Sequence, residues 1–213
     1  MALRRAGIDD TGILAAIERV PREVFVPEVF AERAWEDTTL PIGRGQTISQ
    51  PLVVARMTLA LEPDRRLRVL EVGAGSGYHT AILARLFRRV CTIERHRDLL
   101  ALAEDRWRQL GIRNITAMAG DGSRGWPAQG PFPRILMTAA APGVPGPLVD
   151  QLEPGGVLVA PVGDAHQAQR LLRIRRDDAG TRTEDLGPVR FVPLVPDDVS
   201  GDEDLAANGR DRA

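Results

Sequence analysis

The chain has 213 residues, of which 43% are hydrophobic and 27% charged, a composition typical of one globular domain with a substantial core. Its 28 basic and 29 acidic residues leave a net charge of −1, which argues against nucleic acid as the main partner. The single cysteine, Cys91, excludes a disulfide framework and a thiolate metal site.

The first 66 residues predict helices separated by irregular segments. Isoleucines recur at helical spacing over 8–20, and a second short helix is expected over 28–35. The segment 37–51 is expected to be a loop, because its prolines and glycines break any regular period. The apolar run LVVARMTLAL at 52–61 predicts a buried helix.

From residue 67 the chain alternates between strand-like and helix-like segments. Helices are expected over 77–87 and 97–110, between the first three strands. The predicted strands of this series are 68–72, 90–93, 115–118, 135–138 and 157–160. Such alternation predicts parallel strands joined by right-handed crossovers, with helices on both faces of the sheet.

Two later segments, 169–175 and 189–194, alternate like antiparallel strands added at one edge. The predicted fold class is therefore α/β, a doubly wound Rossmann-like sheet with antiparallel strands at one edge. We expect one domain over 1–195, in which 1–66 form an N-terminal helical and loop region and 67–195 form the sheet. The acidic, small-residue tail at 196–213 has little apolar surface to bury and is expected to be disordered.

A glycine-rich loop, EVGAGSGY at 71–78, directly follows the first predicted strand and opens a helix. Glycines at such a turn let the backbone approach a ligand closely. The dinucleotide fingerprint G-x-G-x-x-G requires a glycine where Tyr78 stands. The spacing of Gly73, Gly75 and Gly77, with Glu71 two residues before the first, resembles the S-adenosylmethionine loop of class I methyltransferases instead.

Two more acidic residues follow the next predicted strands. Glu94 ends the second strand, where a carboxylate can accept hydrogen bonds from both hydroxyls of a ribose. Asp121 follows the third strand and is placed to face an adenine edge. Taken singly, Glu94 reads as a surface carboxylate and Asp121 as a turn residue before glycine. Together with the glycine loop they predict one ligand site at the carboxyl ends of the strands.

Several further stretches carry a resemblance to one family. They are VPREVFVP at 20–27, LPIGRGQTISQP at 40–51, the glycine loop, GDG at 120–122, TAAAP at 138–142, QLEPGG at 151–156 and FVPL at 191–194. Over about residues 3–194 the chain resembles protein-L-isoaspartate O-methyltransferases, and the GQTISQP block is the most specific part of the match.

The resemblance implies that the protein methylates the carboxylate of isoaspartyl residues in damaged proteins and peptides. S-adenosyl-L-methionine is the implied methyl donor, with no metal, and the resulting ester collapses to a succinimide without the enzyme. Ser49 is the implied active-site residue. The residues implied to bind the cofactor are Gln46, Thr47, Ile48, Ser49, Glu71, Gly73, Ala74, Gly75, Ser76, Gly77, Glu94, Asp121 and Gly122.

This chemistry needs no general base, because a carboxylate with a pKa of about 3.9 is already ionised at neutral pH. His79, His96 and His166 are accordingly interpreted as helix or loop residues. Ser49 is expected to hydrogen-bond the substrate carboxylate and aim one oxygen at the methyl group. Without the family match, Thr47 and Ser49 would read equally well as loop-capping residues.

Three positions depart from the family pattern: Pro133 replaces a usual Asp, Trp35 a usual Tyr, and Val195 a hydroxyl residue of some members. Two other functions remain open on the sequence. One is a related methyltransferase that modifies a dedicated precursor peptide, and the other is a non-catalytic cofactor-binding protein. A nicotinamide dehydrogenase is disfavoured because Tyr78 breaks the fingerprint.

The remaining expectations concern partners and location. The partners expected are isoaspartyl-containing proteins or peptides, with no nucleic acid and no membrane, and the protein is expected to be a monomer. No apolar run of 18 residues and no signal-peptide core occur in the sequence, so we expect a cytoplasmic protein.

Overall fold

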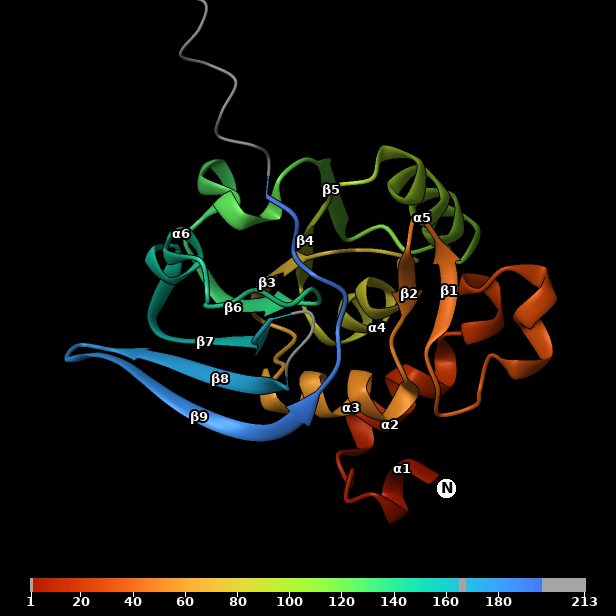
Figure 1. Ribbon diagram of the computed structural model, residues 1–213, viewed down its shortest axis with the longest axis horizontal. Helices are drawn as coiled ribbons and strands as arrows, with labels where there is room; N and C mark the ends of the chain where they lie inside the picture. Colours follow the sequence, from red (N-terminus) through yellow and green to blue (C-terminus); the bar gives the residue numbers. More distant parts are fainter. Residues whose placement is uncertain (1, 165–167, 197–213) are drawn as a thin grey trace, which may run out of the picture.

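The computed structural model describes residues 2–164 and 168–196, so the tail predicted as disordered lies outside the described residues from 197 onward. A seven-stranded sheet runs through the molecule in the order β5-β4-β3-β6-β7-β8-β9 (Figure 1). Its strands are β3 (Arg68–Val72), β4 (Arg89–Glu94), β5 (Ile115–Ala119), β6 (Phe132–Met137), β7 (Leu152–Val162), β8 (Gln169–Asp177) and β9 (Gly180–Val189).

The sheet has the mixed topology that the sequence predicts. Strands β5, β4, β3, β6 and β7 pair in parallel, whereas β8 and β9 are antiparallel additions beyond β7. Because the chain order reverses between β3 and β6, two neighbouring crossovers leave the sheet in opposite directions there. Open α/β sheets bind ligands at this kind of switch point.

The two faces of the sheet are covered unequally. Alternate strand residues point to opposite sides, so Val69 joins one core cluster and Leu70 the other. The first cluster contains the helices α2 (Thr11–Arg19), α3 (Pro51–Ala60), α4 (Tyr78–Leu86) and α5 (Arg97–Gln109). The second contains Leu148 of the short helix α6 (Gly146–Asp150), and Trp126 packs against it between the 3-10 turns η3 (Gly122–Arg124) and η4 (Pro127–Gln129).

In the N-terminal region, the structure confirms the helix predicted from the repeated apolar residues over 8–20. A short helix α1 (Ala2–Arg5) precedes α2, whose first turn is capped by the Asp10 carboxylate, 2.8 Å from Ile13 N. The short helix expected over 28–35 is a 3-10 helix, η2 (Glu28–Arg33), which follows another, η1 (Arg22–Phe25). None of the described helices is long and apolar enough to cross a membrane.

The loop expected over 37–51 is wrong in its central part. Residues there form a β-hairpin of β1 (Leu40–Gly43) and β2 (Gln46–Ile48), shown at the right of Figure 1. The hairpin tip places Arg44 and Gly45 at positive φ, 54° and 70°, a conformation that glycine favours. Helix α3 then begins at Pro51, since proline fits the first turn of a helix without losing a hydrogen bond.

The strand expected over 189–194 is also misplaced. The edge strand is β9 (Gly180–Val189), and residues 190–195 form an irregular segment that we call the C-terminal strap. The strap crosses the sheet past β6 (Figure 1), where Ala140 N donates to Val192 O (2.8 Å) and Leu194 N to Ala140 O (2.6 Å). Its apolar residues therefore contact the carboxyl end of the sheet without continuing β9.

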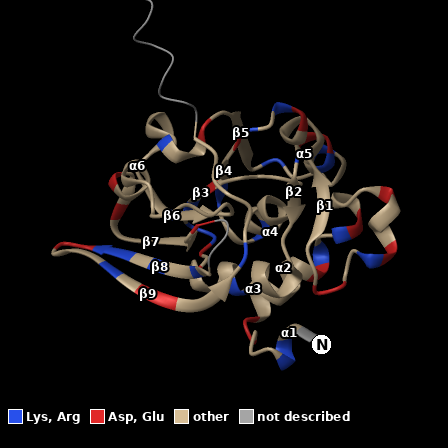
Figure 2. Ribbon diagram, viewed as in Figure 1, with Lys and Arg blue, Asp and Glu red and all other residues tan. Residues whose placement is uncertain are grey.

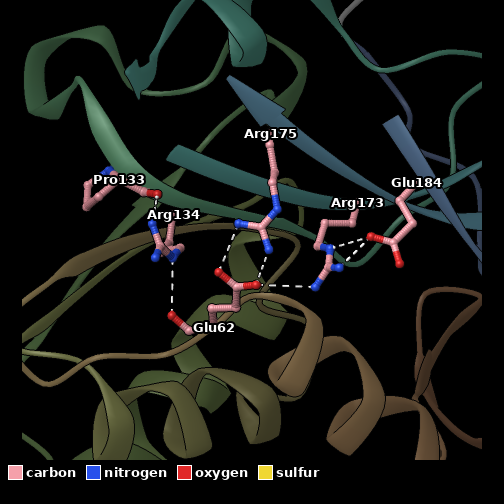
Figure 3. Close-up of polar contacts among 6 residues, drawn as sticks. All are labelled: Glu62, Pro133, Arg134, Arg173, Arg175 and Glu184. Carbon is pink, nitrogen blue, oxygen red and sulfur yellow. Dashed lines mark hydrogen bonds and ion pairs between the residues drawn. The ribbon is translucent and has the colours of Figure 1, made fainter. Parts of the chain in front are cut away.

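Charged residues lie along the β8–β9 hairpin, on α5 and in the N-terminal region (Figure 2). Glu62, which follows α3 with a left-handed φ of 54°, accepts hydrogen bonds from Arg175 and Arg173 of β8 (Figure 3). Its carbonyl accepts a further bond from Arg134 of β6, at 3.2 Å. This cluster ties the end of α3 to the sheet.

Candidate active site

A cavity opens at the carboxyl ends of β3, β4 and β6, between the start of α4, strand β2 and the C-terminal strap. Its walls come from segments far apart in the sequence. The residues lining it are Gln46, Thr47, Ile48, Ser49, Val54, Val72, Gly73, Ala74, Gly75, Ser76, Tyr78, His79, Ile93, Glu94, Arg95, His96, Gly122, Thr138, Ala139, Val192, Pro193, Leu194 and Val195.

Most of the predicted cofactor residues meet in this cavity. Ser49 and the residues before it form one wall, the loop 73–76 forms another, and Glu94 and Gly122 close the far end. Three predicted residues, Glu71, Gly77 and Asp121, do not line it. Each of the three instead supports a residue that does.

Gly73 must be glycine for a packing reason as well as for access to a ligand. Its φ is 100°, and an added Cβ would lie 2.4 Å from Thr138 Oγ1. That hydroxyl lies 2.9 Å from Val72 O and 2.5 Å from Gly73 O, so it ties β6 to the glycine loop. A side chain at 73 would break this tie before reaching any ligand.

Gly77 allows helix α5 to pack closely against the glycine loop. Its φ is 85°, and an added Cβ would lie 2.7 Å from the indole nitrogen of Trp107 on α5. The same indole N–H donates to Gly77 O at 2.8 Å. The third glycine of the motif therefore lets α5 pack against the start of α4.

Glu94 is held in place by two backbone N–H groups. Its carboxylate accepts from Gly75 N at 2.8 Å and from His96 N at 2.9 Å, and the residue is only 6% exposed. Each oxygen keeps a lone pair for a donor in the cavity. A fixed, buried carboxylate beside the glycine loop suits the two hydroxyl donors of a ribose.

Glu71 lies on the other side of the loop, in the core. The hydroxyls of Thr80 and Thr92 both donate to its Oε2, at 2.5 and 2.7 Å, while Oε1 has no hydrogen-bond partner among the described residues. Burial raises the pKa of this carboxyl from 4.5 to about 7, against the opposing effect of the two hydroxyls. Glu71 thus links β3 to β4 and to α4 beneath the cavity.

Asp121 acts as a cap. Its carboxylate accepts from Ser123 N at 2.8 Å at the start of η3 and lies 3.7 Å from Arg124 Nε. The neighbouring Gly122 faces the cavity, and a Cβ there would lie 2.3 Å from Val72 Cγ1. Asp121 therefore places the backbone at 122 beside the end of β3.

Ser49 lies between the end of β2 and the start of α3. Its carbonyl accepts a 2.6 Å hydrogen bond from the buried Arg22, whose Nε also donates to Ala34 O at 2.6 Å. Burial lowers the pKa of the Arg22 guanidinium, with a weaker opposing effect from Tyr78 and then Asp37. The position of Ser49 is thus set from inside the core.

His79 is a lining residue that the sequence did not single out for function. The Thr58 hydroxyl donates its only hydrogen to Val54 O (2.7 Å), so the contact at 2.9 Å requires His79 Nε2 to donate to Thr58. Burial lowers the pKa of His79 to about 3, so the ring is neutral at pH 7. Nothing in the sequence assigns His79 a function, because a single histidine in a helix is common.

Two contacts anchor segments next to the cavity. The Arg44 side chain at the hairpin tip pairs with Asp98 at the start of α5, at 2.7 Å. In the second contact, Arg95 Nη1 donates to Val195 O of the strap at 2.7 Å. Val195 lines the cavity with a carbonyl already in use, so the loss of a hydroxyl at this position leaves the strap anchored through its backbone.

The donors and acceptors of this cavity fit S-adenosylmethionine. Glu94 offers acceptors for ribose hydroxyls, and the glycine loop offers bare backbone to an amino-acid tail. Apolar side chains such as Ile93 and Leu194 supply surface for an adenine ring. In the described part of the chain, no group of His, Cys, Asp and Glu could hold a metal ion.

Comparisons with known proteins agree with this geometry. A family profile described as Protein-L-isoaspartate(D-aspartate) O-methyltransferase matches residues 1–199. Relatives from Rhodospirillum centenum and Rhodospirillum rubrum, both named Protein-L-isoaspartate O-methyltransferase, are each 59% identical over 198 residues. Each alignment covers 92% of this chain and 90% of the relative.

Solved structures show the same fold. One described as a protein-L-isoaspartate O-methyltransferase superposes with a TM-score of 0.80 at 28% identity, over 90% of this chain and 63% of that one. A Plasmodium falciparum protein assigned to the same activity, in complex with S-adenosyl-L-homocysteine, gives a TM-score of 0.77 at 27% identity. That match covers 91% of this chain and 95% of the other.

Proposed function

The chain belongs to the protein-L-isoaspartate(D-aspartate) O-methyltransferase family, and from this premise we propose which of its residues carry out the reaction. The protein methylates isoaspartyl residues with S-adenosyl-L-methionine as methyl donor. In our proposal Ser49 orients the substrate carboxylate, while Glu94 and the glycine loop hold the donor. The observation that carries it is that Ser49, the loop 73–76 and Glu94 line one cavity.

The proposed roles in cofactor binding follow from the contacts described above. Glu94 accepts hydrogen bonds from the ribose, and the backbone of Gly73, Ala74, Gly75 and Ser76 borders the amino-acid tail. Gln46, Thr47 and Ile48 on β2 and Gly122 after β5 form the remaining walls. Glu71, Gly77 and Asp121 support these walls from behind.

The sulfonium of the bound cofactor supplies an activated methyl group. A carboxylate oxygen of the substrate forms a bond to the methyl carbon while the carbon–sulfur bond breaks, and the bonding electrons remain on sulfur. No proton moves, because the carboxylate is ionised at neutral pH. Ser49 contributes position, donating a hydrogen bond to one carboxylate oxygen so that the other faces the methyl group. The neutral His79 is fixed by Thr58 and is not required as a base.

The substrates proposed are damaged proteins and peptides, bound without nucleic acid or membrane by a monomeric enzyme in the cytoplasm. The near-neutral net charge supports the proposal that no nucleic acid is bound, and the single cysteine is compatible with a reducing compartment. We also propose one domain over 1–195, since residues 1–66 supply the Ser49 wall of a cavity whose other walls belong to the sheet.

The test compares two peptides that differ only in the linkage at one residue, isoaspartyl or aspartyl. The isoaspartyl linkage adds a backbone methylene and places the free carboxylate on the α-carbon, so a site built for it misplaces a normal side-chain carboxylate. An error of about 1 Å in reacting geometry costs about 10²-fold in rate. We therefore expect base-released methanol almost entirely from the isoaspartyl peptide.

Each other result has a definite meaning. Equal methylation of both peptides would indicate a general carboxyl methyltransferase. Methylation of neither, by protein that still binds S-adenosyl-L-homocysteine, would contradict the repair function and favour a dedicated precursor peptide. Absence of cofactor binding would contradict the site itself.

A further inference from the structure

Arg22 is a cation enclosed in the core directly behind Ser49. It is the first residue of η1, and its exposed fraction is 0%. Its Nε donates to Ala34 O and its Nη2 to Ser49 O, each at 2.6 Å, and its Cζ lies 4.7 Å from the centroid of the Tyr78 ring. One planar group thus touches the end of η2, the active-site segment and the first residue of α4.

The charge of Arg22 is offset only weakly, by Tyr78 and then by the carboxylate of Asp37. Among the described residues it forms no ion pair, and both its Nη1 and the Tyr78 hydroxyl are buried without a hydrogen-bond partner. Burying a cation in this way costs free energy that an apolar side chain of the same size would not. Packing alone therefore gives no reason for an arginine here, whereas a requirement for two donors in fixed geometry does.

The hydrogen bond to Ser49 also orients the next peptide group. In a trans peptide the N–H points away from the preceding carbonyl, so the Ser49 carbonyl directed at Arg22 turns the Gln50 N–H away from it. No described residue accepts a hydrogen bond from this N–H, and Pro51 after it has none. The guanidinium therefore fixes the direction of the Ser49–Gln50 peptide group and polarises its carbonyl.

We propose that Arg22 is a positioning residue for methyl transfer: its two-point hold on Ala34 O and Ser49 O fixes the Ser49 backbone against the cofactor wall at Tyr78. The inference rests on the proposed role of Ser49. It assigns the main effect to the rate of the chemical step, because Arg22 holds the residue proposed to orient the substrate carboxylate and touches none of Gly73–Ser76 or Glu94, which are proposed to hold the cofactor.

Arg68 offers a matched control at the opposite end of the sheet. It too donates to two backbone carbonyls, Gln129 O at 2.9 Å and Pro131 O at 2.7 Å, and lies over an aromatic ring, Phe132, at 5.5 Å. It stands at the amino end of β3, whereas the cavity lies at the carboxyl ends. Arg22→Met and Arg68→Met thus remove the same kind of side chain from the same kind of contact.

The experiment measures kcat and KM for an isoaspartyl peptide, the Kd of S-adenosyl-L-homocysteine by calorimetry, and the melting temperature. For Arg22→Met we expect kcat to fall by about tenfold to 10²-fold while Kd stays within about threefold. For Arg68→Met we expect a lower melting temperature with kcat unchanged. Arg22→Lys, which keeps the charge but not the two-point geometry, should also bind cofactor normally and turn over slowly.

Wild-type kcat in either folded Arg22 variant would overturn the proposal. So would a loss of cofactor affinity that parallels the loss of kcat, since that pattern indicates a purely structural role. If Arg22→Met does not fold, Arg22→Lys alone decides between these outcomes. The wild-type rate in the same assay tests the proposed function separately, so the two failures can be told apart.

Discussion

In our proposal, Ser49 is the residue on which the chemistry depends most directly. Ser49 lines the cavity and its carbonyl accepts a hydrogen bond from Arg22, whereas no described residue forms a hydrogen bond with its hydroxyl. A hydroxyl left unpaired beside the cofactor wall is available to the substrate. A loop-capping serine would instead bond to nearby backbone.

We expect Ser49→Ala to lower kcat by about 10²-fold, as for the loss of one positioned donor, and to leave the affinity for S-adenosyl-L-homocysteine unchanged. Steady-state methylation of an isoaspartyl peptide and calorimetry test the two parts. Thr181→Val, on the exposed strand β9 outside the cavity, is the control. Wild-type turnover in Ser49→Ala would remove the serine from the mechanism.

Glu71 shows how a residue of a binding motif can act on stability. Because burial raises the pKa of its carboxyl from 4.5 to about 7, the folded state keeps a proton that the unfolded state releases between these values. The free energy of unfolding therefore falls as the pH rises through this interval. The carboxylate formed at higher pH has a buried oxygen, Oε1, to which no residue in the described part of the chain donates a hydrogen bond.

The corresponding prediction is that Glu71→Gln is more stable than the wild type at pH 8, by up to about 3 kcal/mol, and loses the pH dependence between 5 and 8. Denaturant unfolding at several pH values measures this, with the exposed Glu104→Gln as a control for the same chemical change. Because Glu71 does not line the cavity, cofactor affinity should stay within about threefold. A large loss of cofactor affinity would indicate that Glu71 contributes directly to cofactor binding.

For individual residues, most of the predicted cofactor residues line the cavity, but the sequence did not show which of them line it and which support it from behind. Motif spacing places Glu71, Gly77 and Asp121 beside the ligand, and the same spacing is required for their contacts with Thr80, Trp107 and Ser123. A pattern of residue types does not separate contact from support. His79 was missed because only the Thr58 contact reveals its fixed orientation.

Among the elements, the parallel strands were the most predictable. Their apolar runs are largely buried, except in the half-buried edge strand β5, and β3, β4, β5, β6 and β7 all appear where such runs occur. The hairpin of β1 and β2 was missed because Pro41 and the tip glycines hide a strand pattern of only a few residues. Strand β9 was missed because an edge strand rich in Thr, Arg and Glu has no buried face to give it an apolar period.

The cluster around Glu62 joins two elements that the sequence does not relate. Hydrogen bonding from Arg175 holds the pKa of Glu62 below its usual value, so the ionised carboxylate favours the folded state. That contribution is present above the unfolded value of 4.5 and is lost as the pH falls through the folded pKa. The end of α3 should therefore loosen from β8 in acid.

Glu62→Gln should lower the melting temperature at pH 7 by a few degrees, consistent with about 1 kcal/mol for a network of partly exposed ion pairs. Below the pH at which wild-type Glu62 is protonated, the two proteins should melt together. Thermal unfolding from pH 3 to 7 tests this, and Glu36→Gln at the exposed pair with Arg33 is the control. An equal deficit at every pH would mean that the cluster acts through shape and not charge.

For the molecule as a whole, the cavity is the place where segments far apart in the sequence come together. The hairpin, the glycine loop, the end of β4 and the strap all border it. A ligand that binds there stabilises the folded state by mass action, by about 2.7 kcal/mol at 100 times its Kd. For a protein of this size that corresponds to roughly 5–10 °C in melting temperature.

We therefore expect S-adenosyl-L-homocysteine at 100 times its Kd to raise the melting temperature by about this amount. In Glu94→Ala the same ligand concentration should give a much smaller shift, because losing hydrogen bonds to a charged group costs about 1.5–3 kcal/mol of affinity. Differential scanning fluorimetry at matched ligand concentrations tests both statements. An unchanged shift in Glu94→Ala would place the ribose elsewhere.

The C-terminal strap has a consequence for how the enzyme is made. A ribosome extends the chain from its N-terminus, so the hairpin, the glycine loop and Glu94 leave the exit tunnel long before residues 192–195. The sheet can form on the ribosome, but the wall that anchors on Ala140 and Arg95 is among the last described segments to arrive. A nascent chain that ends before residue 190 would therefore have the glycine loop and Glu94 but would lack the strap wall of the cofactor cavity.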